Sequence, residues 1–329
     1  SAISLDDPGQ WEVLVSDVAD KPVMARRKYG KGTLLVSARQ LAGSNPNASD
    51  SINKEIWKPI LEEIAAGKEV SPDTEFRGSG IENLENKVDH GSFILSYNDY
   101  LSPFANLMAD IYNRSLPFIE NRMGVPLSLG MASHVTLLAT GGGGFSSGTV
   151  VALAVWWGGF PEKEDSMIEF LTHESVHSWV LPFPEVWNEP IATYVGNLVM
   201  MDMGHEAEAV RRISSTIERA SKIDPAMTNY DLAGNVSGSG RELESWEKNN
   251  IHWGKSYWIL EQMRKENPDF LSAYFKIKRE YSQKGVIKSY DINNTVAVLS
   301  LAMRRDLFAW FNSIGVPAYK DLADIELSF

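Results

Sequence analysis

The sequence predicts an α+β protein in which a mixed sheet is followed by a helical half. Two observations predict this class. Segments with the composition of strands fall before residue 160, whereas the pattern from Asp165 onward is helical, with apolar residues at helical spacing. Chains in which strands come first and helices follow are typical of α+β domains. The 329 residues suffice for one large or two ordinary domains.

Residues 1–75 predict a small α/β segment. Residues 11–18 have the composition of a strand, and residues 22–39 predict a hairpin that turns at a Y-G-K-G sequence, whose glycines permit positive φ. Residues 52–65 carry apolar side chains at helical spacing, and a polar linker follows over 67–80. The segment resembles the C-terminal end of glutamine-amidotransferase-like domains, in which a Y-G-K-G hairpin recurs.

Residues 81–329 predict a second, larger domain. Strands are expected at 92–97, 134–140 and 149–157. The glycine run 141–144 predicts a flexible turn or, alternatively, a backbone edge that approaches a substrate. It fits no phosphate-binding loop, because no Gly-Lys-Ser/Thr follows it. Helices are expected at 101–123, 165–179, 188–203, 205–222, 242–265, 268–282 and 294–313.

Composition excludes several classes of function. The formal net charge of −12 argues against nucleic-acid binding, which needs a basic face. The chain has no cysteine, so disulfides and thiolate metal sites are excluded, and any metal must be held by His, Asp or Glu. The longest apolar run, Val150 to Phe160, is too short to span a bilayer.

The motif with the clearest chemistry is His173-Glu174-Ser-Val-His177. On a helix, residues four apart lie on the same face, so both imidazoles can bind one metal ion. Glu174 follows the first histidine and can approach the attacking water without taking a ligand position, which is the geometry of a general base. The sequence therefore predicts a metal site with a catalytic carboxylate.

A catalytic zinc site needs a third protein ligand and an open position for water. Glu189 is the preferred candidate, and Glu185 competes with it. Two prolines after His177 are expected to end the first helix and turn the chain. Asn188 is expected to cap a second helix that opens at Glu189. We therefore expect one zinc ion per chain, bound by His173, His177 and Glu189.

The pattern H-E-x-x-H-x-W followed by W-N-E-x-x-A-x-Y resembles the gluzincin metallopeptidases, especially the aminopeptidase N type. This resemblance implies a thermolysin-like catalytic domain over residues 81–329. Eleven residues separate His177 from Glu189, where that family usually has ~18. The Gly-x-Met-Glu-Asn motif that binds a free amino end is absent, so exopeptidase and endopeptidase activity both stay open. A second resemblance, to enhancin-like mucin-directed metallopeptidases, is carried by Gly-Gly-Phe-Pro at 158–161.

The remaining site residues are less sharply defined. The aminopeptidase N type places an oxyanion-stabilising Tyr just before a helical Lys-Gly, and the comparable stretch here offers His252 and Tyr257 for that role. A carboxylate normally fixes each metal-binding imidazole through its other nitrogen. Asp165, Glu169 and Glu185 are candidates for this role, and the sequence does not choose among them. Asn188 and Tyr194 are expected to have structural roles, with contacts that steady the site as the alternative.

The functional expectation is a zinc metallopeptidase that acts on a peptide or glycoprotein substrate, without nucleic acid as a partner and without a membrane span. The alternative is a catalytically inactive peptidase-like module that binds glycans or glycoproteins through aromatic side chains, of which ten are Trp and eleven Tyr. Gluzincins with additional N-terminal modules are often exported, so a secreted, periplasmic or cell-surface location is favoured over the cytoplasm. The oligomeric state is not predicted.

Overall fold

The computed structural model describes two compact units, residues 1–77 and 78–329. The predicted helix over 52–65 and the predicted linker over 67–80 lie outside the described residues. The described residues are 5, 7–16, 22–29, 32–37, 84–97, 101–126, 134–138, 144–147, 150–154, 163–179, 186–238, 240–287 and 289–329.

The first unit contains a three-stranded antiparallel sheet in the order β1-β2-β3. Its strands are β1 (Glu12–Ser16), β2 (Pro22–Tyr29) and β3 (Gly32–Ser37), preceded by the short 3₁₀ helix η1 (Pro8–Gln10). Tyr29 pairs with Gly32, which confirms the predicted hairpin. The Arg27 guanidinium lies 4.6 Å from the centre of the Trp11 ring.

The second unit begins with a five-stranded mixed sheet in the order β4-β5-β6-β8-β7. Its strands are β4 (Asn86–Asp89), β5 (Ile94–Tyr97), β6 (His134–Leu138), β7 (Gly144–Ser147) and β8 (Val150–Ala154). β6 pairs in parallel with β5 and β8, whereas β4 and β7 are antiparallel edge strands. The three predicted strands are confirmed. Of the glycine run 141–144, Gly144 begins β7, and residues 141–143 lie outside the described residues.

Helices make up most of the second unit, so the α+β class is confirmed. They are α2 (Ser102–Met123), α4 (Glu164–Trp179), α5 (Asn188–Asp202), α6 (Glu206–Ser221), α7 (Ser245–Glu266), α8 (Phe270–Gln283), α9 (Ile292–Met303), α10 (Phe308–Ser313) and the 3₁₀ turn η4 (Lys320–Leu322). None of the helices in the described ranges is long and apolar enough to cross a membrane.

The single helix predicted over 294–313 is wrong, because the structure has two helices there. Arg304 adopts a left-handed conformation with φ 53°, which ends α9. The Ser300 hydroxyl then accepts a hydrogen bond from the Leu307 amide, 3.1 Å away. The apolar pattern hides this break, since Leu299 before it and Phe311 after it are both fully buried.

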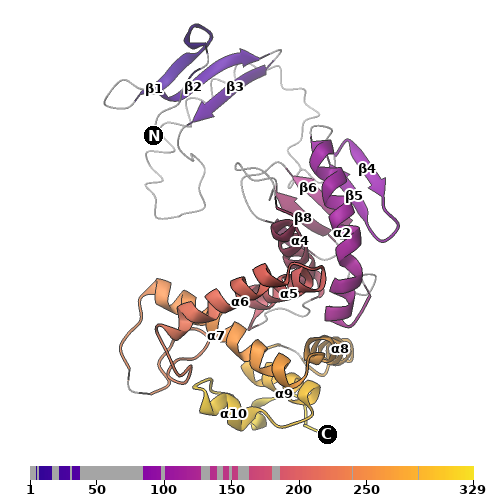
Figure 1. Cartoon of the computed structure of the whole chain (residues 1–329), viewed down its shortest axis with the longest axis vertical. Coiled ribbons are helices and arrows are strands. Elements are labelled where there is room, and N and C mark those ends of the chain that lie inside the picture. Colours follow the sequence, from indigo (N-terminus) through magenta and orange to yellow (C-terminus); the bar gives the residue numbers. More distant parts are fainter. Residues whose placement is uncertain are drawn as a thin grey trace. The chain divides into compact units, whose positions relative to one another are not determined.

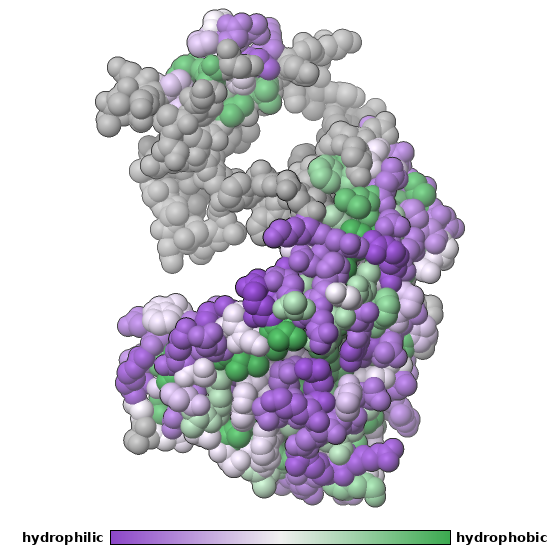
Figure 2. Space-filling model, viewed as in Figure 1, coloured by the Kyte–Doolittle hydropathy of each residue, from purple (hydrophilic) through white to green (hydrophobic). Residues whose placement is uncertain are grey.

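In Figure 1, α4 lies between the sheet with α2 and the group formed by helices α5–α10. It packs against β7 and β8 on one side and against α2 and α5 on others. One continuous apolar core joins the sheet to the helices, from Phe93 and Leu95 in the strands to Phe311 in α10. Hydrophilic side chains cover most of the face of this unit shown in Figure 2, with smaller hydrophobic areas between them. Helix α4 therefore lies at the centre of this unit, packed against both the sheet and other helices.

Candidate metal centre

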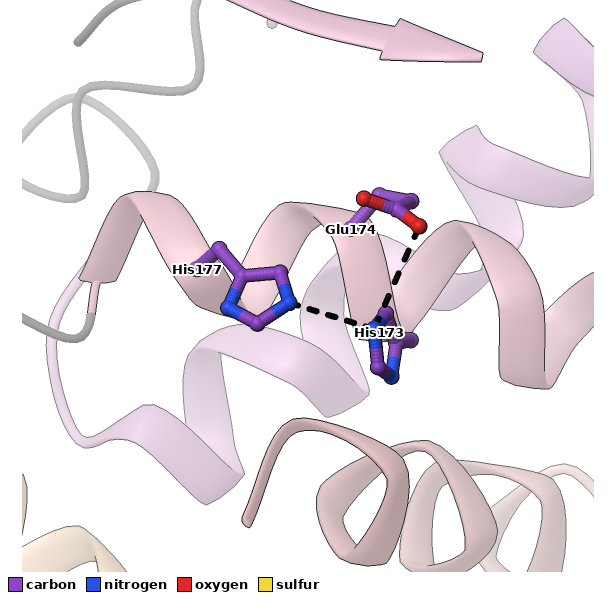
Figure 3. A group of neighbouring side chains, drawn as sticks. All are labelled: His173, Glu174 and His177. Atoms are coloured by element: carbon purple, nitrogen blue, oxygen red, sulfur yellow. Dashed lines mark hydrogen bonds and ion pairs between the residues drawn. The ribbon is translucent and has the colours of Figure 1, made fainter. Parts of the chain in front are cut away.

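Helix α4 carries the H-E-x-x-H motif on a well-anchored framework. Met167, Ile168, Leu171 and Val176 are at most 1% exposed and anchor the helix in the core. The imidazoles of His173 and His177 leave the helix one turn apart, as Figure 3 shows, and their side chains are 16% and 10% exposed. The two rings meet edge to face, with centroids 4.7 Å apart. The motif is therefore helical and nearly buried.

Three potential ligand atoms converge beside α4. His173 Nε2 lies 3.1 Å from His177 Nε2. The Glu189 carboxylate, at the start of α5, contacts both rings: its Oε2 is 3.3 Å from His173 Nε2, and its Oε1 is 3.6 Å from His177 Nε2. The third predicted ligand thus lies beside the two histidines. The competing candidate, Glu185, lies outside the described residues.

These distances fit a metal ion. Zinc binds His nitrogen at about 2.0–2.1 Å and carboxylate oxygen at about 2.0–2.2 Å in tetrahedral sites, so two ligand atoms around one ion lie roughly 3.3 Å apart. The observed 3.1, 3.3 and 3.6 Å bracket that value. Without a cation or a proton between them, two facing imidazole lone pairs at 3.1 Å would repel each other. The donor set therefore fits a bound cation.

The second nitrogen of each imidazole is held by an oxygen from α5. His177 Nδ1 is 3.1 Å from Asn188 Oδ1, an oxygen that only accepts hydrogen bonds, so Nδ1 carries the proton and Nε2 keeps its lone pair for a metal. His173 Nδ1 is 2.8 Å from Thr193 Oγ1. Asn188 was a predicted partner, whereas Thr193 was not. Its position four residues after Glu189, on the same helix face, is the signal that identifies it.

The prediction that Asn188 caps α5 is wrong. Trp187 occupies the N-cap position, and no side chain there makes a capping hydrogen bond. The Asn188 side chain is instead engaged by its neighbours, since its oxygen contacts His177 and its amide donates to Glu189 Oε1 at 3.2 Å. Asn188 thus contacts two of the predicted metal ligands, His177 and Glu189, instead of capping the helix.

The electrostatics couple the three ligands. Burial would lower the pKa of His173, but hydrogen bonding to Glu189 and the nearby charges of Glu174 and Glu169 outweigh it and raise that pKa. Burial and the neighbouring His173 charge lower the pKa of His177. The contact with His173 lowers the pKa of Glu189. A proton on His173 therefore occupies the place that a metal ion would take.

Glu174 lies beside the ligands without matching their geometry. Its side chain is buried, and its Oε1 is 3.9 Å from His173 Nε2, farther than the 3.3 Å of Glu189. Figure 3 shows its carboxylate above the His173 ring rather than between the two imidazoles. Within the described part of the chain, His173, Glu174 and His177 form a group whose ligand atoms all lie within 4.8 Å of one another and which could hold a metal ion.

No family model and no curated protein matches this chain. The site comprises two imidazoles whose Nδ1 atoms each contact an oxygen of α5, one carboxylate that contacts both imidazoles, and a second carboxylate set back from them.

The two candidates for oxyanion stabilisation occupy different places. His252, on α7, is partly buried and lies close enough to Glu189 for its charge to lower the pKa of that carboxyl. Tyr257 is 2% exposed, and its hydroxyl contacts Asn197 Nδ2 at 3.5 Å and interacts with Thr193. Since Thr193 also holds His173 Nδ1, the Tyr257 hydroxyl lies on the side of that ring away from Nε2.

Asp165, Glu169 and Tyr194, which the sequence also offered as supports for the site, make other contacts. Arg212 of α6 lies 3.7 Å from Asp165 and 3.8 Å from Glu169. Burial raises the pKa of Glu169, while the charges of His173 and Arg212 oppose that rise. The Tyr194 hydroxyl donates to Glu261 at 2.6 Å and so ties α5 to α7. These residues brace the helices around the site rather than contact the ligand nitrogens.

Proposed function

We propose that this chain is a zinc-dependent metallopeptidase with a thermolysin-like catalytic domain over residues 81–329. The observation that carries the proposal is the convergence of His173 Nε2, His177 Nε2 and the Glu189 carboxylate, whose two oxygens each contact one imidazole, at the spacing of metal ligands. A site with two histidines and one glutamate is typical of catalytic zinc with an open fourth position. When bound, zinc supplies Lewis acidity, which activates water and polarises the scissile carbonyl.

The protein groups carry the proton transfers. Glu174 takes a proton from the attacking water and returns it to the leaving amine. Its low exposure, 5%, favours this role, since water competes less for the carboxylate. His252, in its protonated form, donates an N–H to the oxyanion that develops on the carbonyl. We prefer it to Tyr257, whose hydroxyl is on the far side of His173.

The surrounding fold supports a peptide substrate. β7 is the edge strand of the mixed sheet and packs against α4, the helix that carries the motif. An extended peptide can add to such an edge through main-chain hydrogen bonds, which would lay its scissile bond along α4. Because the motif that binds a free amino end is absent, we favour an endopeptidase.

The test compares two identical chemical changes, Glu174→Gln and Glu189→Gln. We expect Glu174→Gln to keep about one zinc per chain while losing about 10²–10⁴-fold in activity, because it removes only the base. Glu189→Gln should lose both zinc and activity, because it removes a ligand. The measurements are elemental mass spectrometry and cleavage of a peptide and glycopeptide panel.

Two results would overturn the proposal. One is cleavage by Glu174→Gln at the rate of the parent protein. The other is a zinc-loaded parent that cleaves no member of the panel but binds glycans or glycoproteins tightly, which would instead identify a non-catalytic binding module.

A further inference from the structure

The segment between α6 and α7 contains a small hairpin, residues 229–237, that no site motif predicts. Tyr230 and Val236 pair as an antiparallel bridge. The Asp231 carboxylate folds the tip by accepting hydrogen bonds from the amides of Ala233 and Asn235, at 2.8 and 2.9 Å. The ends are joined by Ser237 N, which donates to the Asn229 carbonyl at 3.0 Å. The hairpin is therefore an ordered element with its own hydrogen bonds.

This hairpin lies along one face of α7. Lys248, His252 and Lys255 are spaced four and three residues apart, so they form a stripe on the helix. At the tip, a Cβ added to Gly234 would lie 2.8–2.9 Å from Cα, Cβ and Cγ of Lys248, and Gly234 has φ 75°. The tip thus approaches α7 so closely that only glycine fits there.

Two backbone carbonyls of the hairpin contact side chains of this stripe on α7. His252 Nδ1 is 3.2 Å from the Leu232 carbonyl oxygen. Lys255 Nζ donates to the Tyr230 carbonyl and, at 2.6 Å, to the Ile314 carbonyl. Residues 230 and 232 are two apart, so their carbonyls leave the same edge of the strand. Lys255 is 0% exposed, so it acts as an internal tie rather than as a surface charge.

The contact with Leu232 selects the state of the His252 ring. A carbonyl oxygen only accepts hydrogen bonds, so it favours forms with a proton on Nδ1. These are the imidazolium and the neutral tautomer whose Nε2 is unprotonated. The neutral tautomer with its proton on Nε2 would place two lone pairs against each other. Nδ1 is therefore the nitrogen that the hairpin holds, and of the two allowed forms only the imidazolium can also donate a hydrogen bond from Nε2.

We propose that hairpin 229–237 is a positioning element that holds the His252 ring by its protonated Nδ1, so that the imidazolium can donate a hydrogen bond from Nε2. The inference rests on the proposed function, in which His252 stabilises the oxyanion, and it assigns the orienting partner of that residue. Leu232 acts through its backbone, Gly234 permits the close approach, and Lys255 fixes the strand that carries the carbonyl.

The experiment uses the zinc-loaded chain and a matched pair of glycine substitutions. Gly234→Ala forces the tip away from Lys248, whereas Gly238→Ala adds the same methyl group where nothing lies within 4 Å. Asp231→Ala is a second variant that removes the carboxylate that folds the tip; Asp231 is only partly buried, and its charge also acts on Lys255. The tautomer of His252 is measured by ¹⁵N NMR on histidine-labelled protein. Its signals, among those of six histidines, are identified by their loss in His252→Gln.

We expect His252 of the parent to be protonated at Nδ1 and to shift toward the Nε2-protonated tautomer in Gly234→Ala and Asp231→Ala. Their kcat should fall ~10-fold or more with KM within about threefold, because misplacing one group by about an ångström weakens catalysis without removing binding. Zinc content should stay that of the parent. Gly238→Ala should match the parent in every measurement.

The inference is overturned if His252 of the parent is a neutral ring protonated at Nε2, or if the tautomer is unchanged in both Asp231→Ala and Gly234→Ala. Loss of zinc in Asp231→Ala with an unchanged tautomer would also overturn it, because the hairpin would then act on the metal ligands. If Gly234→Ala does not fold, Asp231→Ala decides. A parent that cleaves no peptide would refute the proposed function, whereas the NMR comparison would still test the positioning.

Discussion

Removing the Thr193 hydroxyl should weaken zinc binding without removing a ligand. Thr193 Oγ1 is 2.8 Å from His173 Nδ1, and Val has nearly the same shape as Thr but no hydroxyl. A neutral hydrogen bond contributes a net ~0.5–1.5 kcal/mol. Because 1.4 kcal/mol corresponds to a tenfold change in an equilibrium constant, Thr193→Val should raise the zinc Kd by roughly 3- to 10-fold. Removing a group that hydrogen-bonds to a metal ligand typically costs 10–100-fold in affinity or activity, so the effect expected here lies at or below the lower end of that range.

The assay is a competition titration of zinc against a chromophoric chelator, with Thr193→Ser as the matched control that keeps the hydroxyl. We expect Thr193→Ser to bind zinc within about twofold of the parent. Thr193 also interacts with Tyr257, so Thr193→Val loses that contact as well. Thermal unfolding of the metal-free proteins measures the effect of this loss on stability, separately from the effect on zinc binding. If Thr193→Val keeps the parent Kd, or if Thr193→Ser weakens zinc binding equally, then Thr193 does not orient His173.

Three further predictions concern protons and packing. At mildly acidic pH, zinc binding should release protons, because the raised pKa of His173 favours the protonated ring in the metal-free protein. Calorimetry in buffers of different ionisation enthalpy measures this release, and a release near zero would contradict the prediction. In the metal-free protein, the stability that His173 contributes should be lost as pH rises through its raised pKa, and that of Glu189 as pH falls through its lowered pKa. Gly254→Ala should destabilise the chain in urea unfolding by ~1–3 kcal/mol, because its Cβ would lie 2.4 Å from Cβ of Ala220 and 2.5 Å from the Thr216 carbonyl oxygen. Helix propensity alone predicts the opposite sign, a gain of ~1 kcal/mol, so a more stable variant would show that α6 and α7 can move apart.

The sequence predicts those parts of the site that depend on helix pitch. His173 and His177 share a face because residues four apart lie one turn apart, and the apolar positions of α4 show which face is buried. The helix after the prolines was placed almost correctly, since α5 begins at Asn188, one residue before Glu189. These features are local, so a single stretch of sequence contains the information that determines them.

Features that depend on distant contacts were not predicted. β4 and β7 were not predicted, and they form because the neighbouring strand offers a pairing edge. Asn188 resembles a cap, but the imidazole of His177 engages its side chain. The break between α9 and α10 depends on the conformation of Arg304, and the apolar pattern continues across it. The contact between Leu232 and His252 joins backbone to side chain and leaves no residue signature.

Residues 173–193 contain the three proposed ligands and the two groups that contact the imidazoles at Nδ1. These residues belong to α4 and α5, which are adjacent in sequence and pack directly against each other. Closing so short a loop costs little chain entropy, so this helix pair can form before long-range elements such as the mixed sheet are complete. An ion bound to the pair would then stabilise the transition state for folding as well as the native state. Metal supply would in that case set how fast the chain folds, and chains made during a shortage would fold slowly.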